Sequence, residues 1–354
     1  MEKLLSPQTF GSVLDRERAR SDRNGQPFSI LLCNVHTTDV DRLQPRVARI
    51  RGRLRCYDVV GWVDSAVLGV LLPDTAYEGA CSVADMVFQE VGSASVLEQR
   101  SVYTYPLHWA AVEAAGADAP TETPEGLRPI DAWARANQDL QQNHGITMGY
   151  KLPVWKRLMD IAGALVALTL TAPLFMLLAA YIKLVSPGPI FFKQRRVGFL
   201  GEAFVCWKFR TMHQNAEVDV HRNHLADLIH SEGAMTKLDN QDRRIIPLGR
   251  VLRKTGLDEL PQLFNVLAGD MSLIGPRPCI PYEAEQFENW QRRRFDTLPG
   301  ITGLWQVSGK NRTTFKQMMR FDITYAKKKN LLVDTLILIK TLPAVIKQVT
   351  EQKN

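Results

Sequence analysis

The first third of the chain alternates short apolar runs with longer amphipathic stretches. Turn residues such as Asn24-Gly25 and Asp64-Ser65 bound the short runs, whose lengths suit strands. The longer stretches repeat apolar residues every three or four positions, which is typical of helices. The expected elements are helices at Phe10–Arg20, Asp41–Arg53 and Tyr77–Val91, and strands at Phe28–Val35, Val59–Val63, Ala66–Leu72 and Val102–Ala111. Residues 1–115 are therefore predicted to form a small α/β domain.

A polar segment and then a long apolar run follow this domain. Residues 116–150 have the Ala, Pro, Glu, Gly and Gln content of a linker, with a helical pattern only at Ile130–Gln142. Ile161–Ile182 contains no charged residue and is long enough to cross about 30 Å of hydrocarbon as a helix. A buried core helix is the alternative, but such helices rarely run this far without a charge. We therefore expect a membrane segment.

The flanks of the apolar run are basic on both sides, whereas a spanning helix carries basic residues mainly on one side. The flanking cations are Lys151, Lys156 and Arg157 before the run, and Lys183, Lys193, Arg195 and Arg196 after it. Both ends are therefore expected in the cytoplasm. Because Pro173 lies at the midpoint of the run, we expect a re-entrant helix over about residues 157–185 that breaks at Ala172-Pro173 and returns.

Residues 253–278 gather charged side chains around a helix and a turn. Asp258 and Glu259 are adjacent, and two such carboxylates raise each other's pKa unless a metal or nearby cations such as Arg253 compensate them. Pro261 suits the first turn of a helix, so the acids are expected at a helix mouth, where phosphates bind. Helix capping is the alternative role. The rigid turn Gly275-Pro276-Arg277-Pro278 favours a catalytic role for the two acids over helix capping.

Other segments of the second half contribute further cations. A hairpin is expected around Gly198–Gly201, followed by a strand at Ala203–Arg210 that places Lys208 and Arg210 on one face. Two cations on one strand face suit a pyrophosphate, with a merely solvated face as the alternative. The basic triplets at 292–294 and 327–329 are interpreted as surface charge, and Leu331–Val349 as a helix that lies on the bilayer or closes the core.

Composition limits the classes of partner and the kinds of cysteine site that the sequence suggests. The net charge of +7 and the pI near 9.2 favour a negatively charged partner, whether nucleic acid, anionic lipid or phosphorylated substrate. The five cysteines contain no C-x-x-C pair, so neither a disulfide framework nor a zinc site is indicated. No signal peptide is expected, because the N-terminus lacks a basic region followed by a long apolar run.

From about Lys156 onward, the chain resembles the bacterial sugar transferases of the monotopic phosphoglycosyl transferase superfamily. Six blocks carry the resemblance in order: Lys156–Ile161, Ser186–Gly198, Trp207–Met212, Leu257–Val266, Gly269–Pro278 and Pro299–Val307. The resemblance implies a bacterial enzyme at the cytoplasmic face of the inner membrane, anchored over residues 151–354 by the re-entrant helix. Such an enzyme contacts membrane lipids and does not bind nucleic acid.

The resemblance also implies a reaction. A UDP-sugar, with glucose or galactose as the expected hexose, would give its sugar 1-phosphate to polyprenyl (undecaprenyl) phosphate and release UMP, in exopolysaccharide, capsule or O-antigen synthesis. Asp258 would be the nucleophile, and Glu259 with Asp258 would hold Mg²⁺. The expected substrate-binding residues are Lys208, Arg210, Arg253, Gln262 and Arg277. The expected helices and strands of the two halves put the whole chain in the α/β (α+β) class.

The element order of residues 1–115 resembles the GGDEF, or diguanylate cyclase, domain. The positions of that family's metal-binding acids fall on Asn34, Ala66 and Val67, so cyclase activity is not expected and a sensory or homodimerisation role is. Arg55 and Asp58 match the family's R-x-x-D pattern, where cyclic di-GMP could bind. A surface ion pair or turn is the alternative.

Two function hypotheses follow. The first is the phosphoglycosyl transferase, and the second is a catalytically inactive, membrane-tethered adaptor that binds a cyclic dinucleotide. The C-terminal segment keeps its motif acids and bases, including Asp258, Glu259 and Arg277, whereas the N-terminal domain has lost its acids. This difference favours the enzyme.

Overall fold

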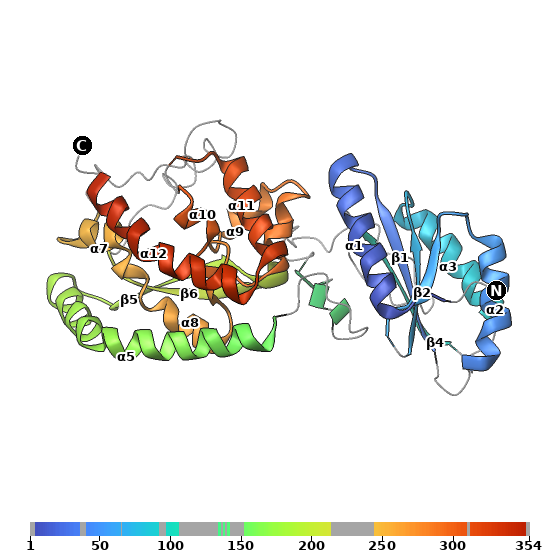
Figure 1. Ribbon diagram of the computed structural model, residues 1–354, viewed down its shortest axis with the longest axis horizontal. Helices are drawn as coiled ribbons and strands as arrows, with labels where there is room; N and C mark the ends of the chain where they lie inside the picture. The colour runs from blue at the N-terminus through green and yellow to red at the C-terminus, as the bar shows by residue number, and fades with distance from the viewer. Residues whose placement is uncertain are drawn as a thin grey trace. The chain divides into compact units, whose positions relative to one another are not determined.

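The computed structural model describes residues 4–35, 40–64, 66–91, 97–105, 134–135, 137–138, 140–141, 152–213, 244–309 and 312–351. The chain divides into two compact units, Met1–Met148 and Gly149–Asn354 (Figure 1). Both combine helices with small sheets, which confirms the α/β (α+β) class.

The first unit is built on an antiparallel four-stranded sheet in the order β2-β3-β1-β4. Figure 1 shows α1 on one face of the sheet and α2 and α3 on the other. Its elements are α1 (Pro7–Asn24), β1 (Phe28–Val35), α2 (Val40–Arg53), β2 (Val59–Trp62), β3 (Val67–Leu72), α3 (Tyr77–Val91) and β4 (Leu97–Tyr105). Because helices cover both faces, β1 is buried almost throughout, which explains its unbroken apolar run.

The helices and strands expected in this unit are confirmed, Phe28–Val35 and Tyr77–Val91 with the predicted ends and the others with shifted ends, except for the last strand. It was predicted at Val102–Ala111, but β4 begins at Leu97 and ends at Tyr105, and residues 106–111 lie outside the described residues. The register with β1 gives the reason, because Phe28 pairs with Tyr105 and Val35 with Leu97. The partner strand thus sets where β4 ends. The residues described between 134 and 141 are helical, within the helix predicted for the linker.

The apolar run forms α5 (Val154–Val185), a single helix of 32 residues. The helix runs without interruption across Ala172-Pro173, so the re-entrant turn expected there stays a prediction. A proline inside a helix removes one hydrogen bond and crowds the preceding turn, which bends the helix, and Figure 1 shows α5 turning at one end. Within the described residues, α5 is the helix long and apolar enough to cross a membrane, and only 11% of its most apolar window is buried.

The rest of the second unit packs against one side of α5. Its elements are β5 (Phe191–Val197), η2 (Phe199–Gly201), β6 (Ala203–Phe209), α7 (Gly249–Thr255), η3 (Leu257–Glu259), α8 (Gln262–Ala268), β7 (Ser272–Ile274), α9 (Pro281–Glu285), η4 (Gln291–Asp296), β8 (Gly300–Thr302), α10 (Leu304–Val307), α11 (Phe315–Lys328) and α12 (Leu331–Glu351). Ala164 of α5 packs with α8, and Ile182 packs with β6 and α7. The predicted hairpin is confirmed as β5–β6.

A buried polar cluster joins α5 to the C-terminal helices and to β7. Lys156 and Asp334 form an ion pair at 2.7 Å with both side chains fully buried. The Tyr325 hydroxyl lies 2.9 Å from Asp334 Oδ1 and from the Ile274 carbonyl oxygen. Asp160 accepts hydrogen bonds from the Ser272 hydroxyl and the Leu273 N–H. Strand β7, which leads into the Gly-Pro-Arg-Pro turn, is therefore held from both sides.

Candidate active site

The two acidic residues lie in a short helical turn between two helices. Gly256 adopts a left-handed conformation, with a φ of 76°, which ends α7 and starts η3. Pro261 is the N-cap of α8, so Asp258 and Glu259 lie at the mouth of that helix. This placement confirms the local prediction made from Pro261.

Glu259 lies between two cations. Its Oε1 accepts a hydrogen bond from Lys208 Nζ at 2.8 Å and lies 3.5 Å from Arg277 Nη1. These groups border a small pocket lined by Arg196, Lys208, Glu259, Gln262, Arg277, Pro278, Gly300 and Ile301. Three cations and one carboxylate line this pocket, so it attracts an anion.

Asn265 fixes the position of Lys208 relative to the acids. From α8, its amide group donates to the Val205 carbonyl oxygen and accepts from the Trp207 N–H, at 2.7 and 3.0 Å. The side chain therefore bonds the free edge of β6 as a neighbouring strand would. This link brings the strand that carries Lys208 against the helix that follows Glu259.

Close backbone packing positions the turn that carries Arg277. A Cβ on Gly275, Gly300 or Gly303 would overlap backbone atoms of the facing segment. Only glycine therefore permits this approach, which places the Gly300 N–H 2.8 Å from the Pro276 carbonyl oxygen. The Pro-Gly-Ile-Thr-Gly sequence thus supports the turn.

Burial and the charges in the pocket shift the pKa values of Arg277 and Arg196. Burial opposes the charge of Arg277, but the carboxylates of Glu259, Glu283 and Asp258 outweigh it and raise the pKa of Arg277. Burial, followed by the positive charge of Arg277, lowers the pKa of Arg196. A bound anion between these two arginines would relieve their repulsion.

The other predicted residues differ in their placement. Gln262 lines the pocket, whereas Asp258, Arg253 and Arg210 do not. Asp258 is buried next to Glu259. Arg253 lies in the last turn of α7. Arg210 donates to the Ser186 and Pro187 carbonyl oxygens at 2.6 and 2.7 Å, so its guanidinium group fixes the chain where it leaves α5.

Arg196 is a pocket residue whose place in the sequence suggested only a charge flanking the apolar run. It lies on β5, four residues after Phe192, which pairs with Lys208, so the alternation of the hairpin places it on the face of Lys208. That register was the signal that could have identified it. The interpretation of residues 292–294 as surface charge was wrong for Arg293 and Arg294, which are buried.

The carboxylates available for a metal ion are Asp258 and Glu259. In the described part of the chain, no group of three or more His, Cys, Asp and Glu side chains is arranged to hold a metal. Mg²⁺ accepts one or two protein carboxylates when substrate phosphates complete its coordination. The acidic pair therefore suits Mg²⁺ that binds together with a phosphorylated substrate.

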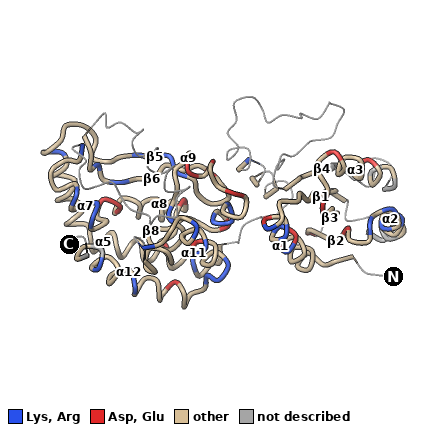
Figure 2. Tube along the Cα trace, turned by 90° about the horizontal axis from the view of Figure 1, so that it is seen from above, with Lys and Arg blue, Asp and Glu red and all other residues tan. Residues whose placement is uncertain are grey.

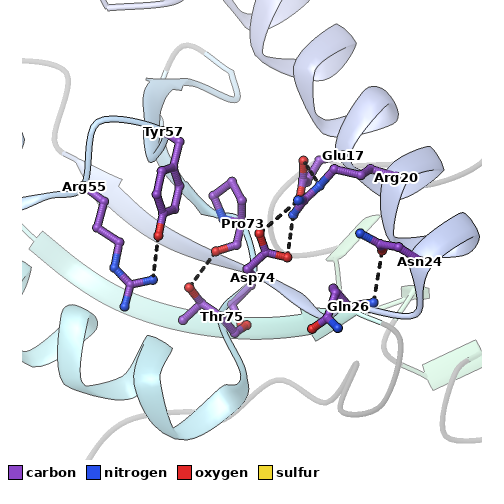
Figure 3. Close-up of polar contacts among 10 residues, drawn as sticks. Glu17, Arg20, Asn24, Gln26, Arg55, Tyr57, Pro73, Asp74 and Thr75 are labelled. Atoms are coloured by element: carbon purple, nitrogen blue, oxygen red, sulfur yellow. Dashed lines mark hydrogen bonds and ion pairs between the residues drawn. The ribbon is translucent and has the colours of Figure 1, made fainter.

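In the first unit, Asn34 and Val67 lie opposite each other on β1 and β3. Asp58 accepts from the backbone N–H of Arg55 at 2.8 Å. Figure 3 shows the Arg55 guanidinium, which donates to the Tyr57 hydroxyl at 3.2 Å. These contacts form a self-contained turn. Figure 2 shows that basic residues occur both on α2 of this unit and on β5 and β6 of the second.

Known proteins resemble the second unit in sequence. Residues 151–348 match the family model described as bacterial sugar transferase. The exopolysaccharide production protein ExoY of Sinorhizobium fredii is 39% identical over 54% of this chain and 84% of its own length. The undecaprenyl-phosphate galactose phosphotransferase of Salmonella typhimurium is 40% identical over 54% of this chain and 40% of its own.

A solved structure resembles a smaller part of the chain. A Pseudomonas aeruginosa structure comprising only a GGDEF domain is similar over 29% of this chain and 72% of its own, at 22% identity and a TM-score of 0.25. The family match covers more than half of the chain and includes the acidic pair, Lys208 and the turn with Arg277. The protein is therefore a transferase, and it belongs to the bacterial sugar transferase family.

Proposed function

We propose that the protein transfers a hexose 1-phosphate, from UDP-glucose or UDP-galactose, to undecaprenyl phosphate and releases UMP. The anion-attracting pocket, in which Glu259 lies between Lys208 and Arg277, carries this proposal. The names of relatives support it, since one is an undecaprenyl-phosphate galactose phosphotransferase and another an exopolysaccharide production protein. The reaction would be a membrane step in the synthesis of exopolysaccharide, capsule or O-antigen.

The proposed chemistry has two displacements at one phosphorus atom. An Asp258 carboxylate oxygen attacks the phosphorus that carries the sugar, the bond from that phosphorus to the UMP oxygen breaks, and UMP leaves. An oxygen of undecaprenyl phosphate then attacks the same phosphorus and displaces Asp258, which gives the lipid diphosphate sugar. The covalent route divides one difficult step into two.

The pocket residues position the donor. Lys208 and Arg277 bind its phosphate oxygens, with Arg277 able to contact two at once, and Gln262 lies beside them. Asp258 and Glu259 would hold Mg²⁺, which neutralises the pyrophosphate charge and stabilises the leaving UMP. Arg196 lines the pocket and is proposed to bind the donor, the role that the sequence suggested for Arg210.

The test is UMP release by the detergent-solubilised protein with undecaprenyl phosphate, Mg²⁺ and a panel of UDP-sugars. We expect release with UDP-glucose or UDP-galactose that depends on the lipid phosphate for more than one turnover. UDP-N-acetylgalactosamine belongs in the panel, because an Aeromonas hydrophila relative is named for that sugar. No release from any UDP-sugar would refute the proposal.

We propose that the protein lies at the cytoplasmic face of the inner membrane, with α5 entering the bilayer and returning. The basic flanks of α5 and its exposed surface support this placement. Helix α12 adds a second apolar surface. Asp334 and Ile337 face the core, whereas Leu332, Ile339 and Leu342 are more than 60% exposed.

The topology predicts the labelling of introduced cysteines. Cysteines near Lys151 and at Lys193, in a protein with the exposed Cys56 changed to Ser, should both resist a membrane-impermeant thiol reagent on the periplasmic side. Both sites should react after the membrane is permeabilised, which is the control. Periplasmic labelling at only one of the two sites would mean that α5 spans the membrane.

The first unit is proposed to be a regulatory or self-association domain without cyclase activity. Nucleotidyl transfer with two metals needs carboxylates, and Asn34, Ala66 and Val67 supply none. The full-length protein should therefore form no cyclic di-GMP from GTP, and formation of the product would contradict the charge argument. Calorimetric titration with cyclic di-GMP, with Arg55→Ala as control, tests ligand binding. If no heat is released at micromolar ligand, self-association is the remaining proposed role of the first unit.

A further inference from the structure

Hydrogen bonds from other segments to its backbone carbonyl oxygens hold the turn that carries Arg277. Four consecutive carbonyl oxygens accept hydrogen bonds: Pro276 from Gly300 N–H at 2.8 Å, Arg277 from Arg294 Nη2 at 2.7 Å, Pro278 from Arg196 Nη1 at 2.9 Å, and Cys279 from Val197 N–H at 2.9 Å. The donors come from β8, η4 and β5. Of the two side-chain donors, Arg196 lines the pocket and Arg294 does not.

Arg294 is buried, with 2% of its side chain exposed, and anionic groups surround it. Its Nη2 lies 2.8 Å from Asp322 Oδ2, and its Nη1 lies 3.8 Å from Glu283 Oε1. Burial opposes the charge of Arg294, but Asp322 and Glu283, together with Cys279, raise its pKa. The guanidinium group therefore stays charged in the interior, and the Arg277 carbonyl oxygen receives a charge-assisted hydrogen bond.

Packing alone does not explain this arrangement. An apolar pair of similar volume usually stabilises a core as well as a buried ion pair does. Here the same Nη2 atom contacts both Asp322 and the backbone of Arg277, the residue whose side chain reaches Glu259. The geometry points to a role for the Arg294–Asp322 pair at the pocket.

We propose that Arg294, oriented by Asp322, is a positioning residue that holds the backbone of Arg277 so that its guanidinium group faces the donor phosphates. The inference rests on the proposed function for the role of Arg277. A displacement of about 1 Å in a substrate-positioning group can cost about 100-fold in rate. A small shift of Arg277 should therefore lower kcat/KM in a protein that remains folded.

The test removes both charges together, as Arg294→Met with Asp322→Leu, to avoid a buried unpaired charge. The matched control is Arg293→Met with Asp296→Leu, which removes the other buried Arg–Asp pair of η4, whose charged atoms lie 3.9 Å apart. We expect kcat/KM for the UDP-sugar to fall about 10- to 100-fold in the first variant. The control should retain kcat/KM within about threefold and a similar melting temperature.

A double-mutant cycle separates positioning from general damage. In an Arg277→Ala background, the Arg294–Asp322 change should alter kcat/KM by less than about threefold, because the group that it positions is absent. An equal loss in both backgrounds would overturn the proposal, as would no loss in the wild-type background.

Hydrogen exchange provides a readout that needs no turnover. The amides of Gly275, Arg277, Cys279 and Ile280 should exchange faster in the Arg294–Asp322 variant and remain unchanged in the control variant. Unchanged exchange in both variants would overturn the proposal even if the enzyme is active. If the wild-type protein released no UMP, the proposed function would fail, and the exchange data would still decide whether Arg294 holds the turn.

Discussion

Asp258→Asn is expected to abolish turnover, with a loss in kcat on the order of 10⁴-fold or more, as seen when an enzyme loses its nucleophile. An amide cannot attack phosphorus to form the acyl phosphate intermediate. Because Asp258 is buried and an asparagine has nearly the same shape, folding should be retained. UMP release and intact-protein mass spectrometry with donor alone provide the measurement, since the wild-type protein should gain the mass of one sugar phosphate and the variant should not.

Glu259→Gln is the matched control, because it changes the neighbouring carboxylate in the same way. It removes the charge that Lys208 and Arg277 contact, so it should leave a trace of activity that extra Mg²⁺ does not restore fully. Near-normal activity in Asp258→Asn would end the covalent mechanism through Asp258. Loss of activity in Glu259→Gln with retained activity in Asp258→Asn would assign the nucleophile to Glu259.

Lys156→Met is expected to lower the free energy of unfolding by about 3–5 kcal/mol, because it leaves the fully buried Asp334 without its cation. For a unit of this size, the melting temperature in detergent should fall by about 6–20 °C. Strand β7 should also loosen, since the Tyr325 hydroxyl lies between Asp334 and the Ile274 carbonyl oxygen. Differential scanning fluorimetry of the solubilised protein measures the effect.

The double variant Lys156→Met with Asp334→Leu serves as the control. It removes both charges, so the melting temperature should recover most of the loss, because an apolar pair can replace a buried ion pair. A double variant as unstable as Lys156→Met would mean that Asp334 is needed for a reason other than its charge. A single variant with an unchanged melting temperature would contradict the prediction.

Several features were predictable because neighbouring residues specify them. Apolar spacing located the helices and strands of the first unit, and the uncharged run located α5. Pro261 placed Asp258 and Glu259 at a helix mouth, since a proline tolerates few other helical positions. The family motifs identified the transferase, because they record which side chains meet in the folded protein.

The contacts of each charge could not be predicted, because they depend on segments far apart in the sequence. Lys208 and Arg210 belong to one short segment, yet Lys208 reaches Glu259 while Arg210 holds the end of α5. Arg253 is near Asp258 in the chain, but it lies on the other side of the left-handed Gly256 and does not line the pocket.

Spacing and local chemistry in the amino-acid sequence were sufficient for the elements, the acidic pair and the family. Tertiary structure alone showed which cations contact Glu259, that β4 pairs with β1 as far as Tyr105, and that Arg294 is buried. The physical reason is that burial of a charge is favourable only next to a partner, and Asp322 comes from a different helix. A run of arginines therefore has the same pattern whether it is solvated or paired in the core.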